Sequence, residues 1–449
     1  MKVEAKLRGE LKRITWPLFI ESALFSLLGS VDTIMLGRYS DNSVAAVGVA
    51  NQIIWMLNLM FGIITAGTSI LIAQYLGAKS KKKTIIQVAG ISIGVNTIIG
   101  VTISFIMFFG GTGMMKLLNS PPELIDLGNQ YLKIVGGFIF IQAITMTFTA
   151  ILRAHSLTKI CMNATIIMNL VNVILNYILI FGKFGFPSMG VSGAALATTL
   201  SKVIGLIILG KATYDLILNK FKMSMFKPFP KIHLINILKI GIPSAAEQIS
   251  YNLSQLVITS FINLIGVSSM AAKSYVGTIV CFSYIFASAV GQGGSILIGN
   301  LVGNKEDNKA YDLCIYTLKK AVVVSIVMSC IIAISGKGIL GFLTSSSEII
   351  SIAVTVFVIE IILEPGRCIN IVGINGLRAT GDVRFPVYIG IFSMWTFGVG
   401  LAYILGVKFN FGLTGIWIAF AIDEWFRGIL VLIRWKTGKW KGKGFVNNL

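Results

Sequence analysis

Long apolar runs separated by short polar connections follow one another along the whole chain. Each run extends over about 20 residues or more, the length that an α-helix needs to cross a bilayer. The runs are continuous and do not alternate in and out, which argues against the strands of a membrane barrel. With Gly, Pro, Asn and Lys clusters as boundaries, the pattern predicts twelve spans: 14–37, 43–76, 84–109, 123–152, 160–181, 191–214, 235–265, 268–302, 318–335, 348–377, 385–407 and 413–435.

The second half of the chain repeats features of the first. The repeated pairs are Pro17 and Pro243, Glu21 and Glu247, Leu152-Arg153-Ala154 and Leu377-Arg378-Ala379, and Gly190/Gly193/Ala197 and Gly412/Gly415/Ala419. An even number of spans in each half predicts a parallel repeat, related by an axis along the membrane normal. We therefore expect an all-α integral membrane protein with two pseudo-symmetric six-helix bundles around a V-shaped central cavity, the architecture of a transporter. The expected parts are an N-terminal bundle (1–218), a cytoplasmic linker (219–233) and a C-terminal bundle (234–449).

Composition and charge agree with a membrane protein. Hydrophobic residues make up 55% of the chain and charged residues 12%, with a mean hydropathy of +0.83, too few polar residues to cover a water-soluble surface. Lys and Arg gather in every second connection, as they do in short cytoplasmic loops, so both termini are expected in the cytoplasm. The net charge of +20 then reflects topology and contact with anionic membrane lipids. A nucleic-acid partner is not expected.

The ends of the chain and its cysteines indicate no processing and no metal. The basic start leads directly into the first span without a small-residue cleavage site, so we interpret it as a helix and not as a signal peptide. The five cysteines show no C-x-x-C spacing, which predicts neither a metal site nor a disulfide framework.

Ionisable residues inside spans are costly and mark functional sites or ion pairs. The carboxylates at such positions are Glu21, Asp32, Glu247, Glu360, Glu364, Asp423 and Glu424. Asp32 is the strongest candidate, because no basic residue lies within a helical turn of it inside the membrane. Asp423 and Glu424 are expected to pair with Arg427, whereas Lys202 has no partner nearby in the sequence.

Three of these carboxylates leave two interpretations open. Glu21 and Glu247 either bind a cation or hold facing helices together. Glu247 also begins a polar stripe at helical spacing that includes Tyr251 and Gln255. Glu364 and Arg367 lie at positions i and i+3 beside Pro365, as a substrate site or as a structural ion pair at a kink.

The motifs together resemble those of the multidrug and toxic compound extrusion (MATE) transporters. They are Pro17, Val31-Asp32-Thr33, Gly190-x-x-Gly-Ala-Ala-Leu-Ala-Thr198 and Leu-Arg-Ala-Thr-Gly-Asp382, combined with the six-plus-six repeat. The resemblance covers the whole chain. It implies a secondary antiporter in a bacterial cytoplasmic membrane that exports cationic and amphiphilic organic compounds, in exchange for H+ or Na+.

The resemblance also implies which residues carry the site. The family's cation-coupling positions in the N-terminal half correspond to Asp32, Asn172, Asn176 and Thr198. Asn176 stands where the family has a second carboxylate, so protonation of Asp32 becomes the favoured coupling event, and Na+ the less favoured one.

The C-terminal half departs further from the family pattern. There, Arg367 stands at an Asp position and Tyr251 at a Glu position of one branch, and Glu247 and Glu364 are each displaced by about one turn. Our candidates for a substrate or second cation site are Glu21, Glu247, Tyr251, Gln255, Glu364 and Arg367.

The mechanism we expect is a proton switch. Asp32 accepts a proton from outside, its neutralisation releases a drug cation, and deprotonation inside resets the site. No resident cofactor is expected, and the protein is expected to be a monomer. The alternatives are a lipid-linked saccharide flippase of the same superfamily, against which the carboxylate-rich spans argue, and a non-catalytic metabolite exporter.

An enzyme or an ATP-driven pump is not favoured. His155 and His233 lie in cytoplasmic connections, and no H-E-x-x-H motif is present. The segment that ends in Gly77-Ala78-Lys79-Ser80 resembles the end of a P-loop, but it has Ile72 where a P-loop needs its first glycine.

Overall fold

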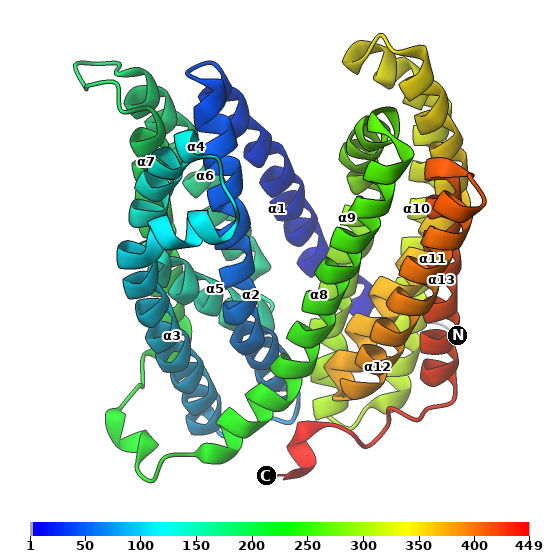
Figure 1. The fold of residues 1–449 in the computed structure, drawn as a ribbon. Coiled ribbons are helices and arrows are strands. Elements are labelled where there is room, and N and C mark those ends of the chain that lie inside the picture. The colour runs from blue at the N-terminus through cyan, green and yellow to red at the C-terminus, as the bar shows by residue number, and fades with distance from the viewer. Residues whose placement is uncertain (1–2, 449) are drawn as a thin grey trace. The chain divides into compact units, whose positions relative to one another are not determined.

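The computed structural model describes residues 3–448, apart from the side chains of residues 25, 27–30, 447 and 448, and all regular structure in this part is helical (Figure 1). The expected all-α class is confirmed. The uninterrupted long helices are α1 (Ala5–Gly37), α2 (Asp41–Gly77), α3 (Lys82–Leu117), α6 (Thr158–Phe181), α7 (Gly190–Thr213), α8 (Lys231–Ile265), α9 (Val267–Gly303), α10 (Asp307–Leu343), α11 (Ser347–Thr380) and α13 (Gly412–Lys436).

Two of the expected spans are composite. The first consists of α4 (Pro122–Tyr131), the π-helical turn η1 (Leu132–Gly136) and α5 (Ile139–Ala154), with a bend of 46° before α5. The second consists of α12 (Arg384–Ser393), which continues as the π-helical segment η4 (Met394–Lys408). Short turns complete the chain: η2 (Tyr214–Leu218), η3 (Met223–Phe226) and η5 (Phe445–Asn448).

Membrane spans are identified by length and hydropathy. Among the described residues, eight helices are long and apolar enough to cross a bilayer, or nine if the bent pair counts as one span. Most helices also extend past the expected ends: α10 covers Asp307–Leu343, where the apolar run predicted only 318–335. The difference has a physical reason, because polar and charged residues such as Asp307 continue a helix outside the bilayer without adding to its apolar run.

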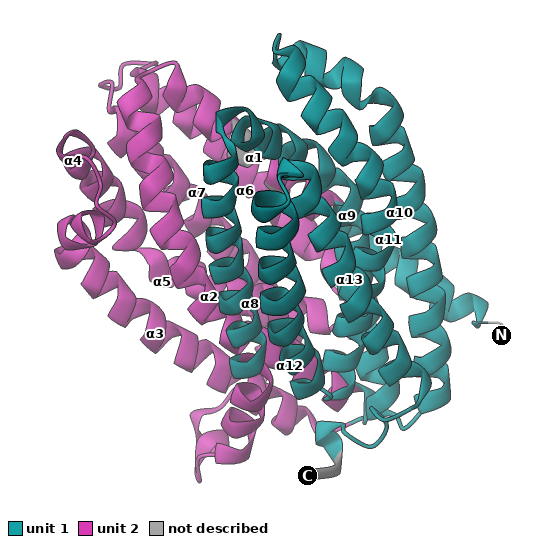
Figure 2. Cartoon of the chain, turned by 45° about the vertical axis from the view of Figure 1, so that its right-hand side comes forward, with its two compact units in different colours: residues 1–19, 77–79, 242–449 teal, residues 20–76, 80–241 magenta. Residues whose placement is uncertain are grey.

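The chain forms two compact units (Figure 2). The C-terminal unit contains residues 1–19, 77–79 and 242–449, and the N-terminal unit contains residues 20–76 and 80–241. These limits differ from the expected boundaries near residues 218 and 234, because α1 and α8 are each divided between the units. Leu11, Ile14 and Leu18 of α1 are buried in one apolar core with residues of α9, α10, α11 and α13.

The start of α8 belongs to the N-terminal unit, where it packs against α2. A Cβ atom added at Gly67 of α2 would lie 2.8 Å from Ile237 Cα of α8, so only glycine permits this approach. The sequence analysis assigned each of α1 and α8 to a single bundle, whereas in the structure each helix contributes residues to both units.

Repeated glycines make equivalent close contacts in the two units. A Cβ atom at Gly193 would lie 2.7 Å from the carbonyl carbon of Leu179, at the end of α6. A Cβ atom at Gly415 would lie 2.7 Å from the carbonyl carbon of Leu405, at the end of η4. The repeated motif therefore seats α7 and α13 directly against the backbone of the preceding helix.

Candidate functional site

The four residues expected to couple a cation come together in the N-terminal unit. Asn176 of α6 donates from Nδ2 to Asp32 Oδ1 of α1, at 2.7 Å, and to Asn172 Oδ1, at 3.2 Å. Asn172 donates to Thr198 Oγ1 of α7, at 3.5 Å. Asn172 and Asn176 share one face of α6 because they are four residues apart. A continuous chain of hydrogen bonds thus links α1, α6 and α7.

Two neighbours of this site were missed from the sequence. Lys202 lies one turn after Thr198 on α7 and interacts electrostatically with Asp32. The expectation from sequence considered only basic residues within a helical turn of Asp32, whereas this lysine comes from another helix. The i, i+4 spacing from Thr198 was the signal that could have found it. Tyr131 of α4 also contacts Thr198.

Glu21 and Glu247 form equivalent ion pairs, one in each unit. Arg153 Nη2 of α5 lies 2.8 Å from Glu21 Oε1, and Arg378 Nη2 of α11 lies 2.7 Å from Glu247 Oε2. Thr165 also donates to Glu21 Oε1, at 3.2 Å. Both partners of each pair were repeated residues in the sequence, so the structure favours the interpretation in which these glutamates hold neighbouring helices together.

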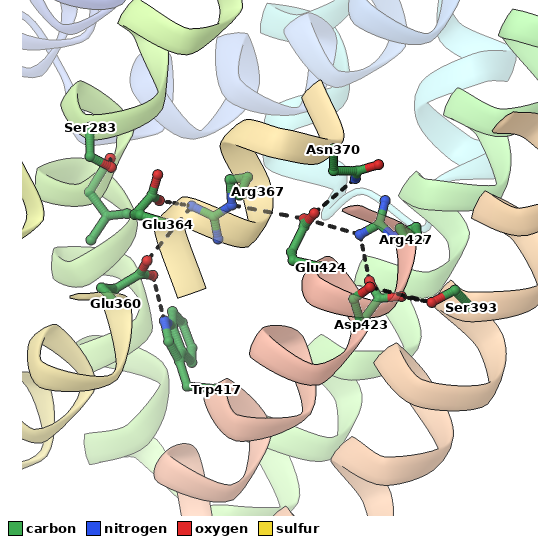
Figure 3. A network of polar contacts seen from close by, with 11 residues as sticks. Ser283, Glu360, Glu364, Arg367, Asn370, Ser393, Trp417, Asp423, Glu424 and Arg427 are labelled. Carbon is green, nitrogen blue, oxygen red and sulfur yellow. Dashed lines mark hydrogen bonds and ion pairs between the residues drawn. The ribbon is translucent and has the colours of Figure 1, made fainter. Parts of the chain in front are cut away.

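A network of charged side chains occupies the interior of the C-terminal unit (Figure 3). Glu364 and Arg367 of α11 form an ion pair. The same guanidinium lies 3.8 Å (Nη1) from Glu360 Oε2 and 3.9 Å (Nε) from Glu424 Oε1 of α13. The local pair expected from the sequence is thus one part of a larger network.

The other half of the network lies on α13. Arg427 Nη2 contacts Asp423 Oδ2 at 2.5 Å and Glu424 Oε1 at 3.0 Å, which confirms the expected pairing. Neutral donors complete it: Ser393 to Asp423 Oδ1 (2.5 Å), Asn370 to Glu424 Oε2 (2.8 Å) and Trp417 to Glu360 Oε1 (2.7 Å).

The remaining candidates for the second site do not all lie at the charged network. Tyr251 of α8 interacts electrostatically with Arg367 and Glu424, so it borders the network. Glu247 interacts in the same way with Arg427, although its direct partner is Arg378. The hydrogen bond found for Gln255 among the described residues lies within its own helix, where Thr259 donates to its backbone oxygen. Glu21 belongs to the other unit.

Charge is balanced differently in the two interiors. In the N-terminal unit, the two carboxylates described above face Lys202 and Arg153. In the C-terminal unit, the ion pair and the network just described contain two more carboxylates than guanidinium groups. The carboxylates are those of Glu247, Glu360, Glu364, Asp423 and Glu424, and the guanidinium groups are those of Arg367, Arg378 and Arg427. Buried charge without a partner is costly, so the C-terminal interior favours a bound cation or proton.

A protein-family model gives the decisive comparison. The MatE model matches residues 17–178 and again 243–404, starting both times at a repeated proline. The chain belongs to the MATE family. Members of this family are transporters, so the protein is a multi-pass membrane transporter and not an enzyme.

Curated relatives match this MATE chain over nearly its whole length. It is 44% identical to the uncharacterized transporter YisQ of Bacillus subtilis, over 99% of this chain and 97% of the relative. It is 28% identical to the probable multidrug resistance protein NorM of Thermotoga maritima, over 97% and 94%.

Solved transporter structures share the fold. The Vibrio cholerae MATE transporter VcmN, solved as a mutant, superposes with a TM-score of 0.88 at 18% identity, over 98% of this chain and 99% of that one. A MOP superfamily transporter from Pyrococcus furiosus superposes with a TM-score of 0.85 at 22% identity, over 95% of each chain. At these identities the likeness concerns the fold alone.

Proposed function

We propose that this MATE transporter is a secondary antiporter that exports cationic and amphiphilic organic compounds in exchange for H+. The observation that carries the proposal is Asp32, an ionisable carboxylate on a membrane helix whose direct hydrogen-bond partner is the neutral amide of Asn176. The names of relatives such as the probable multidrug resistance protein NorM support this class of substrate.

A proton fits the N-terminal site better than Na+ does. The site has one carboxylate, and its other polar groups are two amides and one hydroxyl. Lys202 already places a positive charge near Asp32 and would repel a metal cation there. Protonation instead removes the negative charge without needing further ligands.

The hydrogen-bond chain offers a route from protonation to movement. Ionised Asp32 accepts from Asn176, which also contacts Asn172 and through it Thr198. A proton that binds from outside weakens the bond from Asn176, because a neutral carboxyl group is a poorer acceptor than a carboxylate. α1, α6 and α7 can then rearrange and release the organic cation, and deprotonation inside restores the first state.

The C-terminal network is our candidate for attracting the organic cation. Its excess of two carboxylates favours positive ligands, and Glu364, Arg367 and Tyr251 border one another there. We further propose twelve membrane spans, alternating access, cytoplasmic termini, a monomer in a bacterial cytoplasmic membrane rich in anionic lipid, and no resident cofactor.

A second candidate function is the export of a zwitterionic metabolite. The observation that favours it is the electrostatic interaction between Asp32 and Lys202, which offers one charge of each sign to a substrate. A flippase for lipid-linked saccharides is less favoured, because a pyrophosphate would meet the carboxylates of the C-terminal network.

The test is efflux of a fluorescent cationic dye, ethidium, from proteoliposomes under a pH gradient and a Na+ gradient imposed separately. We expect the pH gradient alone to drive efflux and Asp32→Asn to abolish it. Asp41→Asn, at an exposed position at the start of α2, is the matched control and should leave efflux unchanged. Na+-driven efflux that survives Asp32→Asn would refute coupling at Asp32, and absence of dye movement under either gradient would refute the substrate class.

A further inference from the structure

The connecting segment between η2 and α8, residues 219–230, exposes large apolar side chains. Phe221, Met223 and Phe229 are 42%, 73% and 49% exposed, although they belong to none of the candidate membrane spans. The lysines between and beside them are Lys220, Lys222 and Lys227. Exposed apolar side chains interleaved with lysines are typical of segments that lie in the interface between a membrane and water.

Contacts with the start of α3 hold the connecting segment in place. Gln87 of α3 donates from Nε2 to the backbone oxygen of Met225, at 2.5 Å. The half-buried ring of Phe226 lies against Gly90, where an added Cβ atom would be 2.5 Å from Phe226 Cζ. The segment therefore lies along the side of a membrane helix, and the exposed apolar side chains are those that this packing does not use.

The same contacts place the connecting segment at the level of the lipid headgroups. α3 contains 36 residues, so it is about 54 Å long, whereas the hydrocarbon core is about 30 Å thick. When the excess is divided equally, about 12 Å of helix projects at each end. Gly90 lies about 12 Å from the start of α3, where the helix leaves the hydrocarbon. Figure 1 shows the segment beside this end of α3, in green between α7 and α8.

The charge of the connecting segment is entirely positive. Its three lysines form no ion pair among the described residues, and no Asp or Glu occurs between residues 216 and 246. Such a segment complements a membrane surface whose phosphates are negative. An acidic soluble protein would match the lysines, but it would leave the apolar side chains unexplained at this depth.

We propose that the connecting segment is an interfacial anchor that binds an anionic phospholipid surface. Phe221, Met223 and Phe229 enter the headgroup region, and the lysines contact the lipid phosphates. This contact holds the α3 end of the N-terminal unit at the bilayer surface. The anchor goes beyond the proposed antiport and does not depend on the coupling ion or the cargo.

The test is fluorescence quenching of a tryptophan placed in the segment, in liposomes whose lipids are brominated close to the headgroup. We expect Phe229→Trp to add a fluorescence component that is quenched more strongly in bilayers containing phosphatidylglycerol than in phosphatidylcholine alone. The matched control is Asn304→Trp, at an exposed position between α9 and α10 where no large apolar side chain is exposed, and its added component should not be quenched. An unquenched Phe229→Trp, or equal quenching in the two lipids, would overturn the proposal.

A lysine substitution tests the electrostatic part of the anchor. Lys222→Gln, added to Phe229→Trp, should lower the ratio of inserted to detached segment about fivefold, because one lysine near an anionic surface contributes about that factor. Lys305→Gln, at an exposed position of the α9–α10 connection, is the control and should leave the ratio unchanged. An unchanged ratio in Lys222→Gln would contradict the contact between lysine and phosphate.

Hydrogen exchange of the wild-type protein keeps the proposal testable if Phe229→Trp does not fold. Backbone amides of residues 219–230 should exchange more slowly in nanodiscs with phosphatidylglycerol than in nanodiscs with phosphatidylcholine. Residues 304–309, where two lysines lie next to Glu306 and Asp307, should exchange equally in both. Equal exchange of residues 219–230 in the two lipids would overturn the anchor, whatever the result of the dye-efflux experiment.

Discussion

The two units repeat each other at their helix contacts and differ where their interiors are charged. Glu21–Arg153 and Glu247–Arg378 are equivalent ion pairs, and Gly193 and Gly415 make equivalent close contacts. By contrast, a single carboxylate, two amides, a hydroxyl and a lysine form the N-terminal site.

The C-terminal network instead joins four carboxylates and two arginines. Repetition therefore maintains the helix packing, and divergence marks the positions at which the two units can perform different tasks. We assign proton coupling to the first interior and attraction of the organic cation to the second.

The largest effect is expected from removal of the central cation of the C-terminal network. Arg367→Met leaves Glu360 and Glu364 buried without a guanidinium, and breaking a buried pair in this way costs about 3–5 kcal/mol of stability. We expect a clear fall in the melting temperature of the purified protein. Lys319→Met, at an exposed position on α10, is the control and should melt like wild type.

A second substitution sharpens this prediction. Adding Glu364→Gln to Arg367→Met removes one of the uncompensated carboxylates, so part of the lost stability should return. If Arg367→Met melts like wild type, the network does not hold ionised glutamates, and the contrast between the two interiors is incorrect.

A change in ion selectivity is expected at the N-terminal site. Lys202→Met removes the positive charge beside Asp32, so Na+ should bind more readily there and a Na+ gradient should begin to drive dye efflux. Lys211→Met, at an exposed position further along α7, is the matched control and should not respond to Na+. Equal Na+ responses in the two variants would exclude Lys202 as the selectivity determinant.

The smallest effect is expected at a position where the first half of the chain has a histidine and the equivalent position of the second half has a threonine. His155 follows Arg153-Ala154, whereas Thr380 follows Arg378-Ala379. Burial lowers the pKa of His155, so the unfolded chain takes up the proton more readily than the folded one does. The contribution of neutral His155 to the free energy of unfolding is therefore fully present above about pH 6.5 and is lost as the pH falls.

His155→Thr should remove this pH dependence. We expect the melting temperature of wild type to fall more than that of the variant between pH 7 and pH 5. The same thermal melting measurement at the two pH values tests it. Parallel pH profiles for wild type and His155→Thr would show that His155 does not contribute.

The sequence predicted the helical class and the main elements, because long apolar runs directly reflect the bilayer. It also predicted the cluster of Asp32, Asn172, Asn176 and Thr198, through motif resemblance. It did not predict Lys202 as the neighbour of Asp32, because the two residues lie on different helices and periodicity relates positions on one helix only. The sharing of Arg367 among three carboxylates was missed for the same reason, since Glu424 comes from α13.

The measurement that tests the account most directly counts the protons released when an organic cation binds. It is isothermal titration calorimetry of tetraphenylphosphonium into the purified transporter, repeated in buffers of different ionisation enthalpy. We predict proton release from wild type, and about one proton fewer from Asp32→Asn. Binding of tetraphenylphosphonium to wild type without any proton release would contradict the account.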